Sequence, residues 1–156
     1  MTRLGTIAFV VLFAARALGE ATITNLAPGS PPSSRSGAAL VETDLVPESH
    51  LLFGGNFGTS GSNDLFGFDP QANSWAGIAD VNPPGSRAYC GAAWDSKHRR
   101  LVVYGGLSKG LFGSFRDDLW AWDAGTLTWT QLAMVDAPPP RWGMVFEYLP
   151  HLDRFL

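Results

Sequence analysis

Short apolar runs, separated by clusters of turn residues, recur along the chain from Gly37 to Leu132. In order, the runs cover residues 37–42, 50–53, 64–68, 74–78, 88–94, 101–104, 119–122 and 128–132. Runs of this length that are rich in aromatic and β-branched residues, with Gly, Asn and Asp between them, are typical of β-strands. The continuous apolar run at 101–104 is expected to be covered on both faces of a sheet. The pattern therefore predicts two groups of four strands and almost no helix.

The two groups of strands are related by a sequence repeat. In each unit an arginine follows a proline cluster, and a Gly-Gly pair, an Asp-Leu pair and a tryptophan come after it at nearly fixed spacing. The recurring residues are Arg35, Gly54, Gly55, Asp64 and Trp75 in the first unit, Arg87, Gly105, Gly106, Asp118 and Trp129 in the second, and Arg141 in a third. Motifs that return after about 54 residues indicate repeated supersecondary units. We interpret the recurring residues as structural, and an acidic ligand that meets the arginines is the alternative.

The same motifs resemble the kelch repeat. The resemblance covers residues 31–156 and extends to Leu65, Phe68 and Asp69 in one unit and to Leu119, Trp122 and Asp123 in the next. It implies an all-β fold in which each unit is one four-stranded antiparallel blade of an incomplete β-propeller. The expected blades are 35–86 and 87–140, and 141–156 is expected to begin a third blade in a truncated chain. The remaining tryptophans, among them Trp142, are expected to lie on strands and pack between blades.

The N-terminal segment has a different character. Arg3 is followed by the uncharged stretch 4–15 and by the small residues around Leu18, a pattern that predicts a secretory signal peptide at 1–19. An uncleaved anchor and an organelle-targeting leader are the alternatives. Residues 20–34 are rich in Pro, Ser, Ala and Gly and predict a linker. We therefore expect a secreted or lumenal protein, which touches a membrane only through the signal segment if that segment is not cleaved.

The composition argues against several classes of partner and functional site. The net charge of -3, with only 11 Lys and Arg residues, argues against a nucleic-acid partner. The single cysteine, Cys90, excludes an intramolecular disulfide and a multi-cysteine metal site. Its neighbour Tyr89 invites comparison with the Tyr–Cys cofactor of galactose-oxidase-like proteins, but Ala38 holds the matching place in the first unit, so we interpret Cys90 as a small buried residue. His98 is expected in a solvated turn and Asp118 in a turn hydrogen bond. No catalytic residue, cofactor or metal ligand is assigned.

The segment between the Gly-Gly and Asp-Leu pairs is the part whose length differs between units. It runs over 56–63 in the first unit and over 107–117 in the second. Aromatic side chains beside positive charge are typical of interface hot spots. The predicted ligand-binding residues are Phe57, Lys109, Phe112, Phe115 and Arg116.

These residues lead us to expect a module that binds a protein partner, or a glycan, through its loops. Two alternatives remain open at this point. The chain belongs to a secreted kelch-type enzyme, such as an oxidase or a sugar isomerase, whose active site lies elsewhere. Or it is a structural subunit of a larger assembly, in which neighbouring chains complete its sheets.

Overall fold

The computed structural model describes residues 14–15, 21–22, 26–57, 60–108 and 113–156. The strands are β1 Ala14–Ala15, β2 Ala21–Thr22, β3 Ala39–Glu42, β4 His50–Phe57, β5 Ser60–Asp69, β6 Ser74–Gly77, β7 Gly91–Asp95, β8 Arg100–Tyr104, β9 Leu119–Asp123, β10 Thr128–Leu132, β11 Tyr148–Leu149 and β12 Arg154–Phe155. These residues contain no helix, and accordingly none that is long and apolar enough to span a membrane. Most of the expected signal peptide lies outside the described residues.

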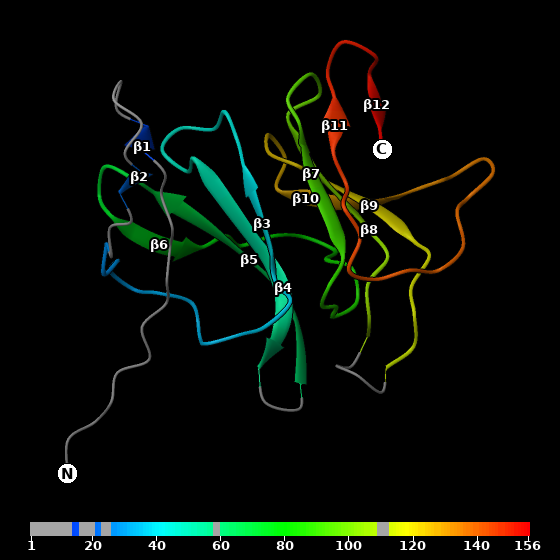
Figure 1. Ribbon diagram of the computed structural model, residues 1–156, viewed down its shortest axis with the longest axis horizontal. Coiled ribbons are helices and arrows are strands. Elements are labelled where there is room, and N and C mark those ends of the chain that lie inside the picture. Colours follow the sequence, from blue (N-terminus) through cyan, green and yellow to red (C-terminus); the bar gives the residue numbers. More distant parts are fainter. Residues whose placement is uncertain (1–13, 16–20, 23–25, 58–59, 109–112) are drawn as a thin grey trace.

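Consecutive strands pair in two antiparallel sheets. The order is β3-β4-β5-β6 in the first sheet and β7-β8-β9-β10 in the second, while β1 pairs with β2 and β11 with β12 (Figure 1). Each strand pairs with its neighbour in sequence because short turns rich in Gly, Asn and Asp allow antiparallel hairpins. The prediction of an all-β chain with two four-stranded antiparallel sheets is therefore confirmed.

The expected propeller is not what these strands form. Two separate four-stranded sheets and two small hairpins are present in the described part of the chain, and none of these sheets closes on itself. Hairpins depend on contacts between neighbouring residues, so an alternating pattern predicts them well. A closed ring of sheets depends on contacts between distant units, about which the local pattern carries no information. The propeller expectation is corrected accordingly.

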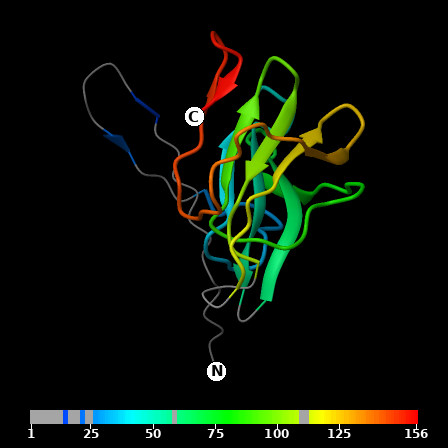
Figure 2. The same ribbon diagram turned by 90° about the vertical axis from the view of Figure 1, so that its right-hand side faces the viewer.

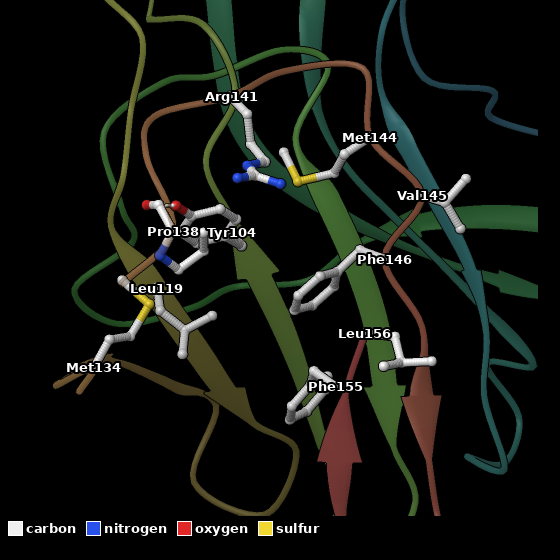
Figure 3. Close-up of a pocket in the computed structure, with 10 residues that line it drawn as sticks. All are labelled: Tyr104, Leu119, Met134, Pro138, Arg141, Met144, Val145, Phe146, Phe155 and Leu156. Carbon is white, nitrogen blue, oxygen red and sulfur yellow. Dashed lines mark hydrogen bonds between the residues drawn. The ribbon is translucent and has the colours of Figure 1, made fainter. Parts of the chain in front are cut away.

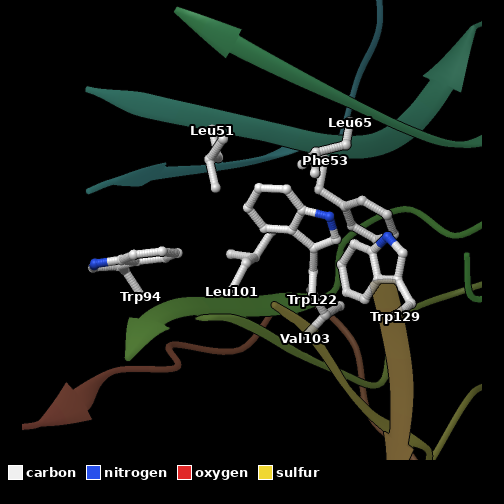
Figure 4. Close-up of a cluster of buried hydrophobic side chains, with 8 residues drawn as sticks. All are labelled: Leu51, Phe53, Leu65, Trp94, Leu101, Val103, Trp122 and Trp129. Carbon is white, nitrogen blue, oxygen red and sulfur yellow. The ribbon is translucent and has the colours of Figure 1, made fainter. Parts of the chain in front are cut away.

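The main hydrophobic core lies between the two sheets. Leu51, Phe53 and Leu65 of the first sheet face a layer from the second sheet, and Figure 4 shows Trp122 and Trp129 pointing toward them. All five side chains are at most 2% exposed. Side chains alternate between the faces of a strand, so the residues of β8 that point away from this core need a second cover.

The third unit contributes that second cover, through Phe146 and the hairpin of β11 and β12 that follows it. Val102 and Tyr104 of β8 are 0% and 3% exposed, and the ring of Tyr104 stacks on Phe146 with 6.4 Å between ring centroids. In the turned view of Figure 2 the red hairpin stands beside the second sheet, where β11 contacts β7. Successive units of the repeat therefore pack face to face along the chain.

The two Gly-Gly pairs occupy equivalent joints between units. Gly54 and Gly105 have φ angles of 66° and 65°, in the left-handed region that favours glycine. A Cβ atom on either would lie 2.6 Å from a carbonyl oxygen, that of Arg87 for Gly54 and that of Arg141 for Gly105. The next residue of each pair donates its backbone N–H to the same carbonyl at 2.9 Å. Glycine is needed because the backbone of the following unit approaches so closely.

Candidate functional site

Each of the first two units contains a buried arginine held by its own Gly-Gly and Asp motifs. The Arg35 guanidinium donates to the Gly54 carbonyl at 2.9 Å and to both carboxylate oxygens of Asp64. The Arg87 guanidinium donates to the Gly105 carbonyl at 3.2 Å and to Asp118 at 2.8 and 2.9 Å. We call this set of contacts the arginine joint. Bidentate pairing of this kind fixes geometry as well as charge.

Burial and pairing act in opposite directions on the carboxylates of the joints. Burial by itself would raise the pKa of Asp118, but hydrogen bonds and charge from Arg87, and a hydrogen bond from the Trp120 indole, hold it below its usual value. The pKa of Asp64 is likewise lowered, against the effect of burial, by Arg35 and by a hydrogen bond from Ser62. Both carboxylates therefore favour the ionised form in the folded chain.

This lowering of the pKa predicts acid-sensitive stability. A carboxylate whose pKa is lower in the folded state stabilises the fold above its unfolded pKa, about 3.9 for Asp, and that contribution is lost as the pH falls through the folded value. We expect the free energy of unfolding of the wild-type chain to fall more between about pH 7 and about pH 3 than that of the Asp118→Asn variant. Equilibrium denaturation at several pH values measures this. The control is Asp117→Asn, which changes the exposed neighbouring carboxylate and should leave the pH dependence of the free energy of unfolding as in the wild type. The same pH dependence in all three proteins would contradict the account.

Arg141 makes the same local hydrogen bond as the other two arginines, but it lacks a paired aspartate among the described residues. Its Nε donates to the carbonyl of Pro139 at 3.2 Å, as that of Arg35 does to Ser33 and that of Arg87 to Gly85. Among the residues that the structure describes, Arg141 forms no ion pair.

The first two units together present a loop edge, which we define as residues 60–62 of β5 together with 107–108 and 113–116. Leu107 bridges to both Ala88 and Phe115, and Ser108 and Ser114 exchange hydrogen bonds at 3.0 Å. These contacts fix the two ends of the loop. The Phe115 side chain is nevertheless 57% exposed. Of the other predicted binding residues, Lys109 and Phe112 lie outside the described residues, as does the side chain of Phe57.

Arg116 differs from its neighbour because it turns inward. Its backbone N–H donates to Gly106 at 2.9 Å, and its Nη2 donates to the carbonyl of Ser86 at 3.4 Å. A Cβ atom on Gly85 would lie 2.7 Å from that nitrogen. Burial and the nearby charge of Arg87 lower the pKa of Arg116, although Asp118 acts in the opposite direction. Arg116 thus positions the loop and offers only part of its guanidinium to a ligand.

The loop edge draws on both sheets. Gly61 of the first sheet lies so close to Ser108 that a Cβ there would be 3.2 Å from the Ser108 carbonyl oxygen. The Ser86 hydroxyl donates to the same carbonyl at 3.4 Å, and the Asn63 amide donates to Pro84 at 3.1 Å. In Figure 1 the described lower ends of β4 and β5 and the described parts of this loop all lie toward the lower end of the molecule.

A polar cluster that the sequence did not reveal lies around Asp95. Its buried carboxylate accepts hydrogen bonds at 2.8 Å from the His98 ring and from Arg100, and Asp153 of the third unit lies 3.8 Å from the same ring. These acidic and histidine side chains lie close enough for a metal ion. However, Arg100 already pairs with Asp95, and Lys97 pairs with Asp153 at 2.5 Å. The cluster is accounted for as a hydrogen-bonded turn. His98 lies in the expected turn with its side chain 43% exposed, and it also hydrogen-bonds Asp95.

Cys90 occupies a structural position. A Cβ atom on Gly106 would lie 3.0 Å from that of Cys90, just as one on Gly55 would lie 3.0 Å from that of Ala38. Burial raises the pKa of the Cys90 thiol to about 11, so the reactive thiolate is disfavoured. The interpretation of Cys90 as a small packed residue at the repeat position of Ala38 agrees with this geometry.

No family model matches the chain. The chain is similar to the acyl-CoA-binding domain-containing protein 5 of Arabidopsis thaliana, with 34% identity over 117 residues. That match covers 74% of this chain, which spans only 17% of the length of the Arabidopsis protein.

These comparisons, together with the separate open sheets, overturn the resemblance to the kelch repeat. The relative is named for an acyl-CoA-binding domain, and no kelch family is indicated. The motif that suggested the family has a local explanation in this chain. The Gly-Gly pair is required by the close approach of the next backbone, and the aspartate is required by the buried arginine. The kelch-type enzyme alternative loses its support with the family.

Proposed function

We propose that this protein is a binding module that engages a protein partner through its loop edge. The observation that carries the proposal is Phe115, which is 57% exposed on a loop whose two ends are fixed by backbone hydrogen bonds. A large aromatic side chain held in solvent by a hydrogen-bonded backbone loses little conformational entropy on binding. Loops of variable length on a regular scaffold are common binding surfaces.

The neighbourhood of Phe115 supports a polypeptide ligand. Ser60, Gly61 and Ser114 give the edge small residues and polar backbone groups, and Arg116 adds a partly exposed cation. Such a mixture of one aromatic anchor, hydrogen-bonding groups and positive charge is typical of protein interfaces. A glycan also stacks on aromatic rings and is an outcome that the experiment below separates. If residues 1–19 act as a signal peptide, the partner is secreted or lumenal.

The name of the Arabidopsis relative raises acyl-CoA as another ligand. That name describes a protein of which this chain spans 17%. An acyl-CoA ligand requires an apolar channel for its chain and several cations for its phosphates. The described part of the loop edge offers one exposed aromatic ring and one half-buried arginine, which suit a peptide surface better.

Removal of the Phe115 side chain should weaken binding to the partner without destabilising the fold. We expect Phe115→Ala, alone or combined with Phe112→Ala, to reduce capture of the partner from the native source by about tenfold, as for hot-spot truncations. The matched control is Leu127→Ala, another exposed apolar residue (40%), which lies on the β9–β10 turn. Capture is quantified by mass spectrometry, with denaturation curves to show that all variants remain folded.

The same experiment distinguishes the outcomes. Capture that is abolished by glycosidase treatment of the source would assign the edge to a glycan. Full retention of every captured protein by the Phe115 variants would show that the edge is only a surface loop, and the proposal would fall.

A further inference from the structure

Arg116 is a cation that the repeat itself does not require. Ser62 and Arg116 hold equivalent positions, because each lies two residues before the aspartate of its unit. Their backbones are placed alike: a Cβ atom on Gly54 would lie 3.3 Å from the Ser62 carbonyl oxygen, and one on Gly105 would lie 3.3 Å from that of Arg116. The first unit therefore has a small hydroxyl where the second has a guanidinium, and the shared backbone accepts either.

The serine is satisfied within its own unit, whereas the arginine is not. The Ser62 hydroxyl donates a hydrogen bond to Asp64. The Arg116 side chain has one acceptor among the described residues, the Ser86 carbonyl at 3.4 Å, and its buried Nε has none there. A guanidinium carries five N–H groups that can donate. Most of the hydrogen-bonding capacity of this half-buried side chain is therefore unused within the described part of the chain.

The positive charge of Arg116 is also poorly balanced by its surroundings. Both oxygens of the nearby Asp118 carboxylate already accept hydrogen bonds from Arg87, at 2.8 and 2.9 Å. Arg116 forms no ion pair with any residue that the structure describes. The loop stretches 58–59 and 109–112, which lie outside the described residues, contain no Asp or Glu. Two guanidinium groups thus share one carboxylate at this place.

The surroundings of Arg116 are polar and belong to the joint between the first two units. By contrast, Arg141 lines an apolar pocket of about 250 Å³ between the second and third units (Figure 3). The Arg116 guanidinium lies against Gly85, and a Cβ atom on Gly61 of the first sheet would lie 3.4 Å from the Ser86 hydroxyl oxygen. That hydroxyl makes only a long hydrogen bond of 3.4 Å, so it is a second donor available to a ligand.

We propose that Arg116 selects partner segments that carry an acidic side chain, and that an Asp or Glu of the partner pairs with its guanidinium beside the Ser86 hydroxyl. An apolar group of the same segment packs on Phe115. This assignment rests on the function proposed for the loop edge and adds the chemical class of its ligand. A carboxylate fits the fork of a guanidinium through two parallel hydrogen bonds, as Asp118 already does for Arg87.

The test begins with a phage-displayed library of random heptapeptides, which is selected on the full chain. We expect the selected peptides to be enriched in Asp and Glu. Selection on the Arg116→Ser protein, which copies the residue of the first unit, should lose this enrichment. Selection on the Arg99→Ser protein, changed at an exposed arginine on the β7–β8 turn, should keep it. The Arg116→Ser protein should retain the wild-type denaturation midpoint, because Ser62 shows that the repeat accepts serine there.

Isothermal titration calorimetry with one selected peptide then measures the pairing itself. Replacement of the peptide's acidic residue by the corresponding amide should weaken its binding to the wild-type chain at least about tenfold. The original peptide should lose affinity by the same factor on the Arg116→Ser protein. The amide peptide should lose nothing further on that variant, since both changes remove one interaction. Arg116→Lys should restore part of the affinity, because lysine keeps the charge but not the fork.

The possible outcomes distinguish the carboxylate pairing from the function on which it rests. Peptides that require Phe115 but bind the Arg116→Ser protein with full affinity would overturn the pairing and leave the loop edge as a binding surface. Selection of no peptide, or only of peptides that require neither residue, would overturn both. Inorganic phosphate that shifts the NMR signal of the Arg116 Nε–H group, while acetate at the same concentration does not, would assign the position to a phosphorylated ligand and overturn the carboxylate.

Discussion

Replacement of Trp129 by alanine is expected to lower the free energy of unfolding by about 3–5 kcal/mol. Its side chain is 0% exposed, its ring lies 4.9 Å from that of Phe53, and its indole nitrogen donates to Asp80. The variant leaves a large cavity between the two sheets and deprives Asp80 of its partner. Chemical denaturation followed by far-UV circular dichroism measures the loss, since fluorescence would change with the tryptophan itself.

Trp142 provides the matched control. It is 47% exposed and lies outside the strands, where its ring contacts only Tyr89 among the ring pairs found, at 5.7 Å. Trp142→Ala should cost less than about 0.5 kcal/mol, as most exposed substitutions do. Similar losses for the two tryptophans would show that the core does not lie between the sheets as described.

The second large effect is expected at the arginine joint. Arg87→Met should lower the free energy of unfolding by about 3 kcal/mol, at the low end for a broken buried pair because the Asp118 side chain is 19% exposed. Arg87 itself is completely buried, and its loss leaves the Gly105 carbonyl without this donor and Asp118 with only the hydrogen bond from the Trp120 indole. The denaturation midpoint and its slope together measure the change.

The third unit supplies the control for this experiment. Arg141→Met removes an arginine from the same repeat position, where no ion pair is present within the described chain. We expect this substitution to change the free energy of unfolding by less than about 0.5 kcal/mol. A loss at Arg141 as large as that at Arg87 would mean that the arginines stabilise the fold through something other than the carboxylates.

The sequence predicted the strands well because they depend on local signals. The run at 101–104 lies within β8, and the Gly-Gly pairs fall at equivalent joints with nearly identical φ angles. Trp75 and Trp129 are buried as expected. Trp142 was predicted wrongly as a strand residue, because the third unit keeps the first-strand sequence without forming a strand there.

The contacts between distant residues could not be predicted in the same way. Asp118 was expected to hydrogen-bond a turn, yet it pairs with Arg87, 31 residues earlier. Gly29 lies in the expected linker, yet it exchanges backbone hydrogen bonds with Asn73 and Trp75 beside β6. Neither pairing follows from spacing, because it depends on how the hairpins fold back on each other.

The exposure of the candidate binding residues could not be predicted from the sequence either. Phe115 and Arg116 are neighbours with the same expected role, but Phe115 points to solvent while Arg116 turns under the loop toward Ser86. Burial of an arginine here depends on Gly85, whose lack of a side chain leaves room for the guanidinium. That glycine belongs to the preceding proline cluster, so no local pattern connects it with the loop.

The central claim, that the loop edge binds a partner protein, is tested most directly by photo-cross-linking at position 115. Phe115 is replaced by the photoreactive residue benzoylphenylalanine in the full chain, and the same residue is placed at Leu127 as a control. We predict that irradiation in the native source yields a covalent adduct with one discrete protein from position 115 and none from position 127. Adducts from both positions alike, or from position 127 alone, would contradict the claim that the loop edge is the binding surface.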